Sequence, residues 1–175
     1  MADKRQLVIG GHDGFTPHIG DLVGMMEYVR ATTLQAVDGL SMVELDHLAD
    51  AESNSIGALL AHIAAVESYY QAASFEQRDF TDAERERWGV AVQLGPHTRK
   101  AIRGRPLEHY LTDLAEVRSR TLAMLAERDD AWLAETVELP WARLNNHFMW
   151  FHVFEDELNH RGQIRWLRKR LPANR

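Results

Sequence analysis

Four long segments with apolar residues at helical spacing constrain the fold of this chain more than any other feature. In each segment, apolar side chains recur three or four positions apart, the spacing of a helix that buries one face. The predicted helices span residues 21 to about 40, 53 or 55 to about 73, 106 to about 127, and 145 or 146 to 171. No strand-like alternation of apolar and polar residues accompanies them. We therefore predict an all-α protein whose helices form a four-helix bundle.

Capping and helix-breaking residues define the segments between these helices. Ser41 and Glu44 have the spacing of a capping box and predict a short helical turn, and Thr81 and Glu84 repeat the pattern. Asp21 is the predicted N-cap of the first long helix. Three stretches are predicted to be irregular: the lead-in 1–20, the glycine- and proline-rich connection 88–106, and residues 128–144.

Length and charge restrict the class of protein. A chain of 175 residues suits one domain spanning 1–175. It contains no cysteine, so any thiol nucleophile must come from a cosubstrate. The net charge of -6 argues against a nucleic-acid partner, which needs a basic face. We find neither a signal peptide nor a membrane span in the sequence, and we predict a cytoplasmic protein with no membrane partner.

The last predicted helix carries three titratable residues on a face that is otherwise built for burial. His152, Asp156 and His160 are spaced four residues apart and therefore lie in line along one side of the helix. Burying an unpaired charge costs several kcal/mol, so these groups need partners. A divalent cation would satisfy them, because imidazole and carboxylate groups four residues apart on a helix can reach one ion.

A third ligand must come from a facing helix, and His62 is the best candidate. It lies at the edge of the apolar stripe of the second predicted helix. Three protein ligands leave a coordination position open to water or substrate, as in a catalytic site, and zinc or nickel is the expected metal. Two other interpretations stay open at this point. His62 fits a hydrogen-bonded core histidine, and the residues of the last helix fit a polar seam.

Two motifs resemble those of the DinB-like superfamily. Residues 54–67, NSIGALLAHIAAVE, resemble its second-helix signature, and residues 156–164, DELNHRGQI, resemble its last-helix signature. The resemblance extends over essentially the whole chain and is closest to the branch near the mycothiol-dependent maleylpyruvate isomerases. It implies a four-helix bundle with a metal site whose ligands map to His62, Asp156 and His160.

An aspartate at position 156 departs from the family pattern, which has histidine there in many members and glutamate in the isomerase-like branch. Because aspartate is shorter, His152, one turn earlier, is the alternative ligand. Gly162 is expected to permit close helix approach, and Gln163 to point to the core as a donor near the metal. Two further residues are expected at helix flanks, the second of them in an ion pair: Glu67 and Arg161.

The resemblance implies a thiol-dependent transferase or isomerase. In such enzymes a metal activates the thiol of mycothiol or bacillithiol toward a small-molecule electrophile. The alternatives are a metal-dependent hydrolase and a non-enzymatic metal-binding or stress-response protein. A second apolar face on the last helix favours a homodimer: Phe148, Phe151, Leu158 and Trp166.

Overall fold

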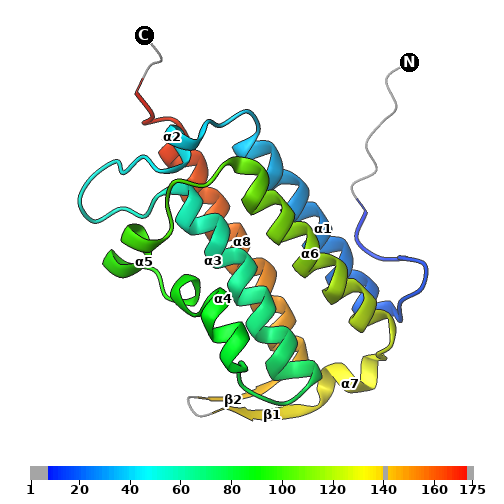
Figure 1. The fold of residues 1–175 in the computed structure, drawn as a ribbon. Helices are drawn as coiled ribbons and strands as arrows, with labels where there is room; N and C mark the ends of the chain where they lie inside the picture. Colours follow the sequence, from blue (N-terminus) through cyan, green and yellow to red (C-terminus); the bar gives the residue numbers. More distant parts are fainter. Residues whose placement is uncertain (1–7, 140–141, 173–175) are drawn as a thin grey trace, which may run out of the picture.

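Four long helices lie side by side along the molecule (Figure 1). The computed structural model describes residues 8–139 and 142–172. The long helices are α1 (Pro17–Val37), α3 (Ile56–Tyr70), α6 (Leu107–Ala126) and α8 (Asn146–Arg168). Helix α8 packs against α1 and α3, and α3 also packs against α6. The predicted four-helix bundle is confirmed.

Shorter elements join the long helices. They are α2 (Met42–Leu45), the π-helical turn η1 (Gln71–Phe75) that continues α3, α4 (Asp82–Val92), α5 (Pro96–Ala101), α7 (Asp130–Ala134) and the strands β1 (Thr136–Leu139) and β2 (Ala142–Asn145). The two strands pair antiparallel, with Thr136 opposite Asn145. None of the helices in the described ranges has both the length and the apolar character needed to cross a membrane.

Side-chain caps begin several helices where the sequence predicts them. Ser41 and Thr81 each form a complete capping box at the start of α2 and α4. Of the two serines predicted to cap the second long helix, Ser55 does so, because its hydroxyl accepts from the N–H of Ala58 at 3.2 Å. Asn145 caps α8, where its amide oxygen accepts from a backbone N–H at 2.8 Å. The caps Ser55 and Asn145 thus fix the starts of α3 and α8, the two helices described below as carrying the candidate metal ligands.

The first helix begins at Pro17, so the prediction of Asp21 as its N-cap is wrong and the irregular lead-in is shorter than 1–20. A distant carboxylate explains the difference. Asp130 accepts from the hydroxyl of Thr16 at 2.6 Å and from the N–H groups of His18 and Ile19 at 3.1 and 3.2 Å. It therefore satisfies the free N–H groups of the first turn in place of a local cap.

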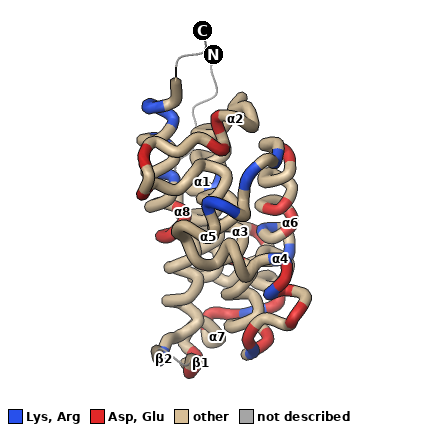
Figure 2. The backbone as a smooth tube through the Cα atoms, turned by 60° about the vertical axis from the view of Figure 1, so that its left-hand side comes forward, with Lys and Arg blue, Asp and Glu red and all other residues tan. Residues whose placement is uncertain are grey.

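The segment 88–106 is more ordered than predicted, because α4 extends to Val92 and α5 follows it. Trp88 and Ala91 are buried and belong to the same core cluster as the apolar residues of α3. On its other side, α4 places Arg87 beside Asp113 and Glu116 of α6, at 2.9 and 2.7 Å. Figure 2 shows acidic and basic positions intermixed along α4 and α6.

The expectation of irregular backbone over 128–144 is also wrong, since α7 and the β1–β2 hairpin lie there. Strands of four residues are too short to give a clear alternation of apolar and polar residues. At the other end, α8 stops at Arg168 instead of 171. The N–H groups of Arg170 and Leu171 bond to carbonyls three residues back, so the last turn tightens before Pro172.

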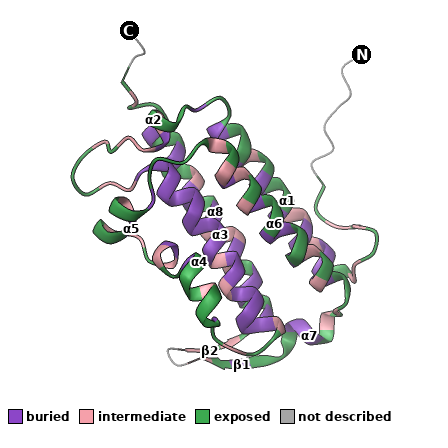
Figure 3. Ribbon diagram, in the orientation of Figure 1, coloured by how far each residue is buried: buried purple, intermediate pink, exposed green. Residues whose placement is uncertain are grey.

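Helix α3 is the most buried of the long helices (Figure 3). Inside the bundle, each long helix contributes one charged residue to a buried cluster: Arg30, Glu67, Arg118 and Glu157. Nε of Arg30 is 2.9 Å from Oε1 of Glu157, and Nε of Arg118 is 2.8 Å from Oε1 of Glu67. Both glutamates are fully buried, so the prediction of Glu67 at a helix flank is wrong. Two positive and two negative charges tie the four helices together.

Candidate metal centre

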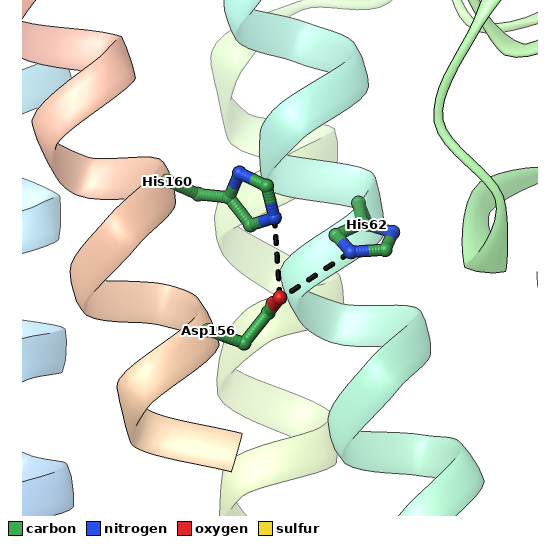
Figure 4. A group of neighbouring side chains, drawn as sticks. All are labelled: His62, Asp156 and His160. Atoms are coloured by element: carbon green, nitrogen blue, oxygen red, sulfur yellow. Dashed lines mark ion pairs between the residues drawn. The ribbon is translucent and has the colours of Figure 1, made fainter. Parts of the chain in front are cut away.

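The structure brings His62 of α3 together with Asp156 and His160 of α8 (Figure 4). The ring centroids of the two histidines are 4.8 Å apart and their planes are perpendicular. Nε2 of His160 lies 3.2 Å from Oδ1 of Asp156, and Nε2 of His62 lies 3.7 Å from Oδ2. One nitrogen or oxygen from each residue therefore falls within 4.8 Å of the others. The two α8 residues are one turn apart and share a face, as the spacing predicts.

Helix α4 orients the ring of His62. Nδ1 of His62 lies 2.8 Å from the carbonyl oxygen of Ala91. A carbonyl can only accept, so Nδ1 donates to it, and the ring is held with Nε2 on the side of Asp156. A backbone carbonyl that fixes the far nitrogen of a histidine is a common support of metal-binding imidazoles.

The three side chains are largely enclosed, with 10–15% of each side chain exposed. Burial raises the pKa of Asp156, but the neighbouring imidazoles of His160 and His62 outweigh it and hold that pKa well below its usual range. The carboxylate is thus negatively charged at neutral pH. Its Oδ2 atom is buried without a hydrogen-bond partner among the described residues, as is Nδ1 of His160. Unsatisfied buried atoms of this kind are uncommon in folded proteins.

These residues fit a divalent ion. Two ligands that bind a tetrahedral ion at about 2.0–2.2 Å lie roughly 3.4 Å apart. The separations of 3.2 Å from His160 to Oδ1 of Asp156 and of 3.7 Å from His62 to Oδ2 are near that value, and the three ligand atoms lie within 4.8 Å of one another, so the side chains would have to draw closer to share one ion. Two imidazoles and one carboxylate suit zinc or nickel better than calcium or magnesium, which prefer oxygen ligands.

The alternative ligand His152 lies outside this group. Its Nδ1 donates to Oε2 of Glu155 at 2.9 Å, and its ring stacks on Phe148. The expected donor Gln163 is exposed and lines a separate hollow together with residues 52–54, away from the candidate ligands.

Two other expectations near the site are wrong. A Cβ atom built on Gly162 meets nothing within 4 Å, so this glycine does not serve close helix approach. Arg161 donates to the hydroxyl of Thr32, and no acidic side chain of the described residues pairs with it. Arg161 thus faces α1, and Gly162 lines a hollow beside residues 52–54.

A hollow of about 420 Å³ opens beside the three candidate ligands, and we call it the tyrosine hollow. Its lining comes from α3, α4 and α8: His62, Val66, Tyr69, Tyr70, Val92, His152 and Asp156. Burial, reinforced by Tyr69 and Asp156, raises the pKa of Tyr70 to about 12, so its hydroxyl stays protonated and can donate. Both tyrosines follow His62 at helical spacing, and Tyr70 belongs to the apolar stripe of the second predicted helix.

A larger hollow of about 1120 Å³ lies between α1 and α6, away from the candidate ligands. Arg30 and Arg118 belong to its lining. Every guanidinium nitrogen of both residues already has a protein partner. These arginines therefore need no bound anion.

Comparison with known proteins identifies the family. The sequence profile of the mycothiol-S-transferase family matches residues 21–173. A crystal structure described as a conserved protein from Enterococcus faecalis shares the fold, with a TM-score of 0.71 and 12% sequence identity over 85% of this chain and 94% of that one. No curated protein matches the chain. The expected DinB-like relationship is confirmed. Because the family match extends over nearly the whole chain, the protein belongs to the mycothiol-S-transferase family.

Proposed function

We propose that this protein joins the thiol of mycothiol to a small electrophile, using a zinc or nickel ion held by His62, Asp156 and His160. The convergence of three ligand atoms within 4.8 Å, at the edge of a hollow, is the observation that carries this proposal. The choice of mycothiol as the thiol follows from the family match. The chain contains no cysteine, which agrees with a thiol that comes from a separate molecule. A divalent ion at this position would lower the pKa of a bound thiol, so that thiolate forms near neutral pH.

The residues of the tyrosine hollow suit the electrophile. Val66, Val92 and the ring of Tyr69 offer apolar walls. The protonated hydroxyl of Tyr70 can donate to an oxygen or halide that gains negative charge as it leaves. In the overall reaction the sulfur forms a bond to carbon, the leaving group departs with the electron pair, and the thiol proton passes to solvent.

A conjugation assay tests this function. Zinc-loaded protein is mixed with mycothiol and 1-chloro-2,4-dinitrobenzene, and the thioether product is followed by absorbance. At pH 7 we expect rates at least about 20-fold above the uncatalysed reaction, because a free thiol with a pKa of about 8.5 is only a few per cent ionised. His160→Ala should lose this gain, and His147→Ala, at an exposed position of the same helix, should keep it. Metal-loaded protein that consumes no thiol with a panel of electrophiles would favour a non-enzymatic metal-binding protein.

The outer face of α8 supports a second proposal, that two copies of the chain form a dimer. Phe148, Phe151 and Leu158 are 41–46% exposed there, and a cluster of exposed apolar side chains often marks an interface. An antiparallel α8 pair centred near residue 153 would place Phe148 of one copy opposite Leu158 of the other. The same apolar patch would thus pack against itself, as a two-fold interface requires.

Sedimentation measurements of molecular mass test the dimer directly. We expect the wild-type protein to sediment with twice the chain mass of 20.0 kDa, and the double variant Phe151→Asp/Leu158→Asp to sediment with the mass of one chain. The introduced carboxylates would repel each other and lose hydration in the interface. A wild-type protein that remains monomeric at high micromolar concentration would contradict the dimer without affecting the proposed chemistry.

A further inference from the structure

The tyrosine hollow contains a third histidine, His152, which stands apart from the candidate metal ligands. It lies on α8 one turn before Asp156, about 6 Å along the helix axis, and both side chains line the hollow. His152 is absent from the group whose ligand atoms converge. An imidazole gains and loses a proton near neutral pH, so one at the wall of a candidate active site is available for proton transfer.

Hydrogen bonds orient the imidazole of His152. Its Nδ1 donates to Oε2 of Glu155 at 2.9 Å, and the side-chain amide of Asn159 donates to Oε1 of the same carboxylate. Both oxygens of Glu155 are therefore engaged, which holds the carboxylate beside the ring. Nε2 of His152 has no hydrogen-bond partner among the described residues. A histidine that a carboxylate orients through one nitrogen keeps the other nitrogen as a base.

Two aromatic rings hold the plane of the same imidazole. It is stacked on Phe148, with 6.1 Å between the ring centroids and 13° between the planes. The ring of Tyr70 meets it edge-on, at 5.9 Å and 89°. A group that transfers a proton benefits from being held in place before the substrate arrives. Because 38% of the His152 side chain is exposed, a proton that it accepts can pass on to water.

The other residues of the lining are poor proton acceptors near pH 7. Valines do not titrate, and phenols act as donors there. Tyr70 in particular keeps its proton, because burial raises its pKa to about 12. The pKa of Asp156 is held well below its usual range by the neighbouring imidazoles, which makes its carboxylate a weak base. The imidazole of His62 donates to the carbonyl of Ala91 through Nδ1 and has Nε2 on the side of Asp156. His152 is the remaining base, and Tyr70 is an acid in the same hollow.

We propose that His152 is the general base of the conjugation reaction. This role rests on the proposed function and adds a catalytic residue to it. Nε2 of His152 accepts the proton of the thiol, and the electron pair of the S–H bond stays on sulfur. Sulfur then uses an electron pair to bond to carbon, and the leaving group departs with the pair of the bond that breaks. The imidazolium that forms is paired with Glu155 and releases its proton to water.

Kinetics of zinc-loaded His152→Gln test this role. With mycothiol and 1-chloro-2,4-dinitrobenzene we expect kcat to fall about 100-fold, which is within the usual range for loss of a general base. The KM for each substrate should stay within about twofold, because the lost interaction is made only in the transition state. His147→Gln makes the same change at an exposed position of α8 and should keep the wild-type kcat. Imidazole added to His152→Ala should raise its rate at least about tenfold by replacing the missing base.

The tautomer of His152 gives a readout that does not depend on turnover. In proton–nitrogen correlation spectra of the zinc-loaded wild-type protein, at mildly alkaline pH, the ring should carry its proton on Nδ1 and none on Nε2. Glu155→Ala removes the acceptor of that proton and should lose this preference.

Three results would overturn the role of His152: an unchanged kcat in His152→Gln, a proton found on Nε2 in the wild type, or loss of zinc from the variant, which would make His152 a metal ligand. Wild-type protein that holds zinc but transfers no thiol would overturn the proposed function, and this role with it. Wild-type turnover that persists in His152→Gln would overturn the role alone.

Discussion

Replacing His62 or His160 with alanine is expected to abolish zinc binding by this protein. Wild-type protein should hold one zinc ion per chain after gel filtration, and each variant should bind zinc at least about 100-fold more weakly. The estimate is a minimum, because losing even a residue that only supports a ligand costs about 10- to 100-fold in affinity. Metal content is measured by plasma emission spectrometry, and affinity by competition with a chromogenic chelator.

Two histidine controls make this result specific. His147→Ala removes an exposed imidazole from α8 and should leave zinc binding unchanged. His152→Ala decides the alternative ligand: its ring is paired with Glu155, so we expect this variant to keep its zinc. Equal zinc content in the wild type and in the His62 and His160 variants would mean that these two rings merely share a polar seam. Loss of zinc from His152→Ala would instead assign that residue to the metal.

Helical periodicity explains why much of the site could be predicted. Asp156 and His160 share a face of α8 through their spacing alone, and His62 follows from the apolar stripe of α3 together with the family motif. The support for His62 could not be predicted, because the carbonyl of Ala91 belongs to a segment that the sequence suggests is irregular. The same holds for Val92 in the tyrosine hollow and for Asp130 at the start of α1. Each of these depends on contacts between distant segments, which local patterns do not encode.

The positions of the buried charged residues in the sequence indicate burial, although charged residue types ordinarily indicate exposure. Each charged residue of the cluster follows a buried apolar residue by four positions: Arg30 follows Met26, Glu67 follows Ile63, Arg118 follows Leu114, and Glu157 follows Val153. Each charged residue thus occupies a position in the helical repeat where an apolar residue is expected. A charged residue at such a position is ordinarily assigned to a helix edge. The pattern becomes informative only when two acidic and two basic residues do this on four helices.

Glu67→Ala is therefore expected to destabilise the protein by about 3–5 kcal/mol, because it leaves Arg30 and Arg118 buried without one of their shared carboxylates. Glu116→Ala makes the same chemical change at an exposed ion pair with Arg87 and should cost at most about 1 kcal/mol. Urea unfolding at pH 7, followed by circular dichroism, gives both values. Similar losses in the two variants would mean that the cluster contributes little to stability.

The pH dependence of that loss follows from the protonation of Glu67. Burial alone would raise the pKa of this carboxyl, but the charges and hydrogen bonds of Arg118, with the charge of Arg30, lower it to about 2. In the unfolded chain its pKa is near 4.5. The stabilisation is thus fully present above about pH 4.5 and is lost as the pH falls toward about 2. The difference in unfolding free energy between wild type and Glu67→Ala should shrink over this interval. A difference that stays constant from pH 7 to pH 3 would mean that Glu67 acts through packing and not through its charge.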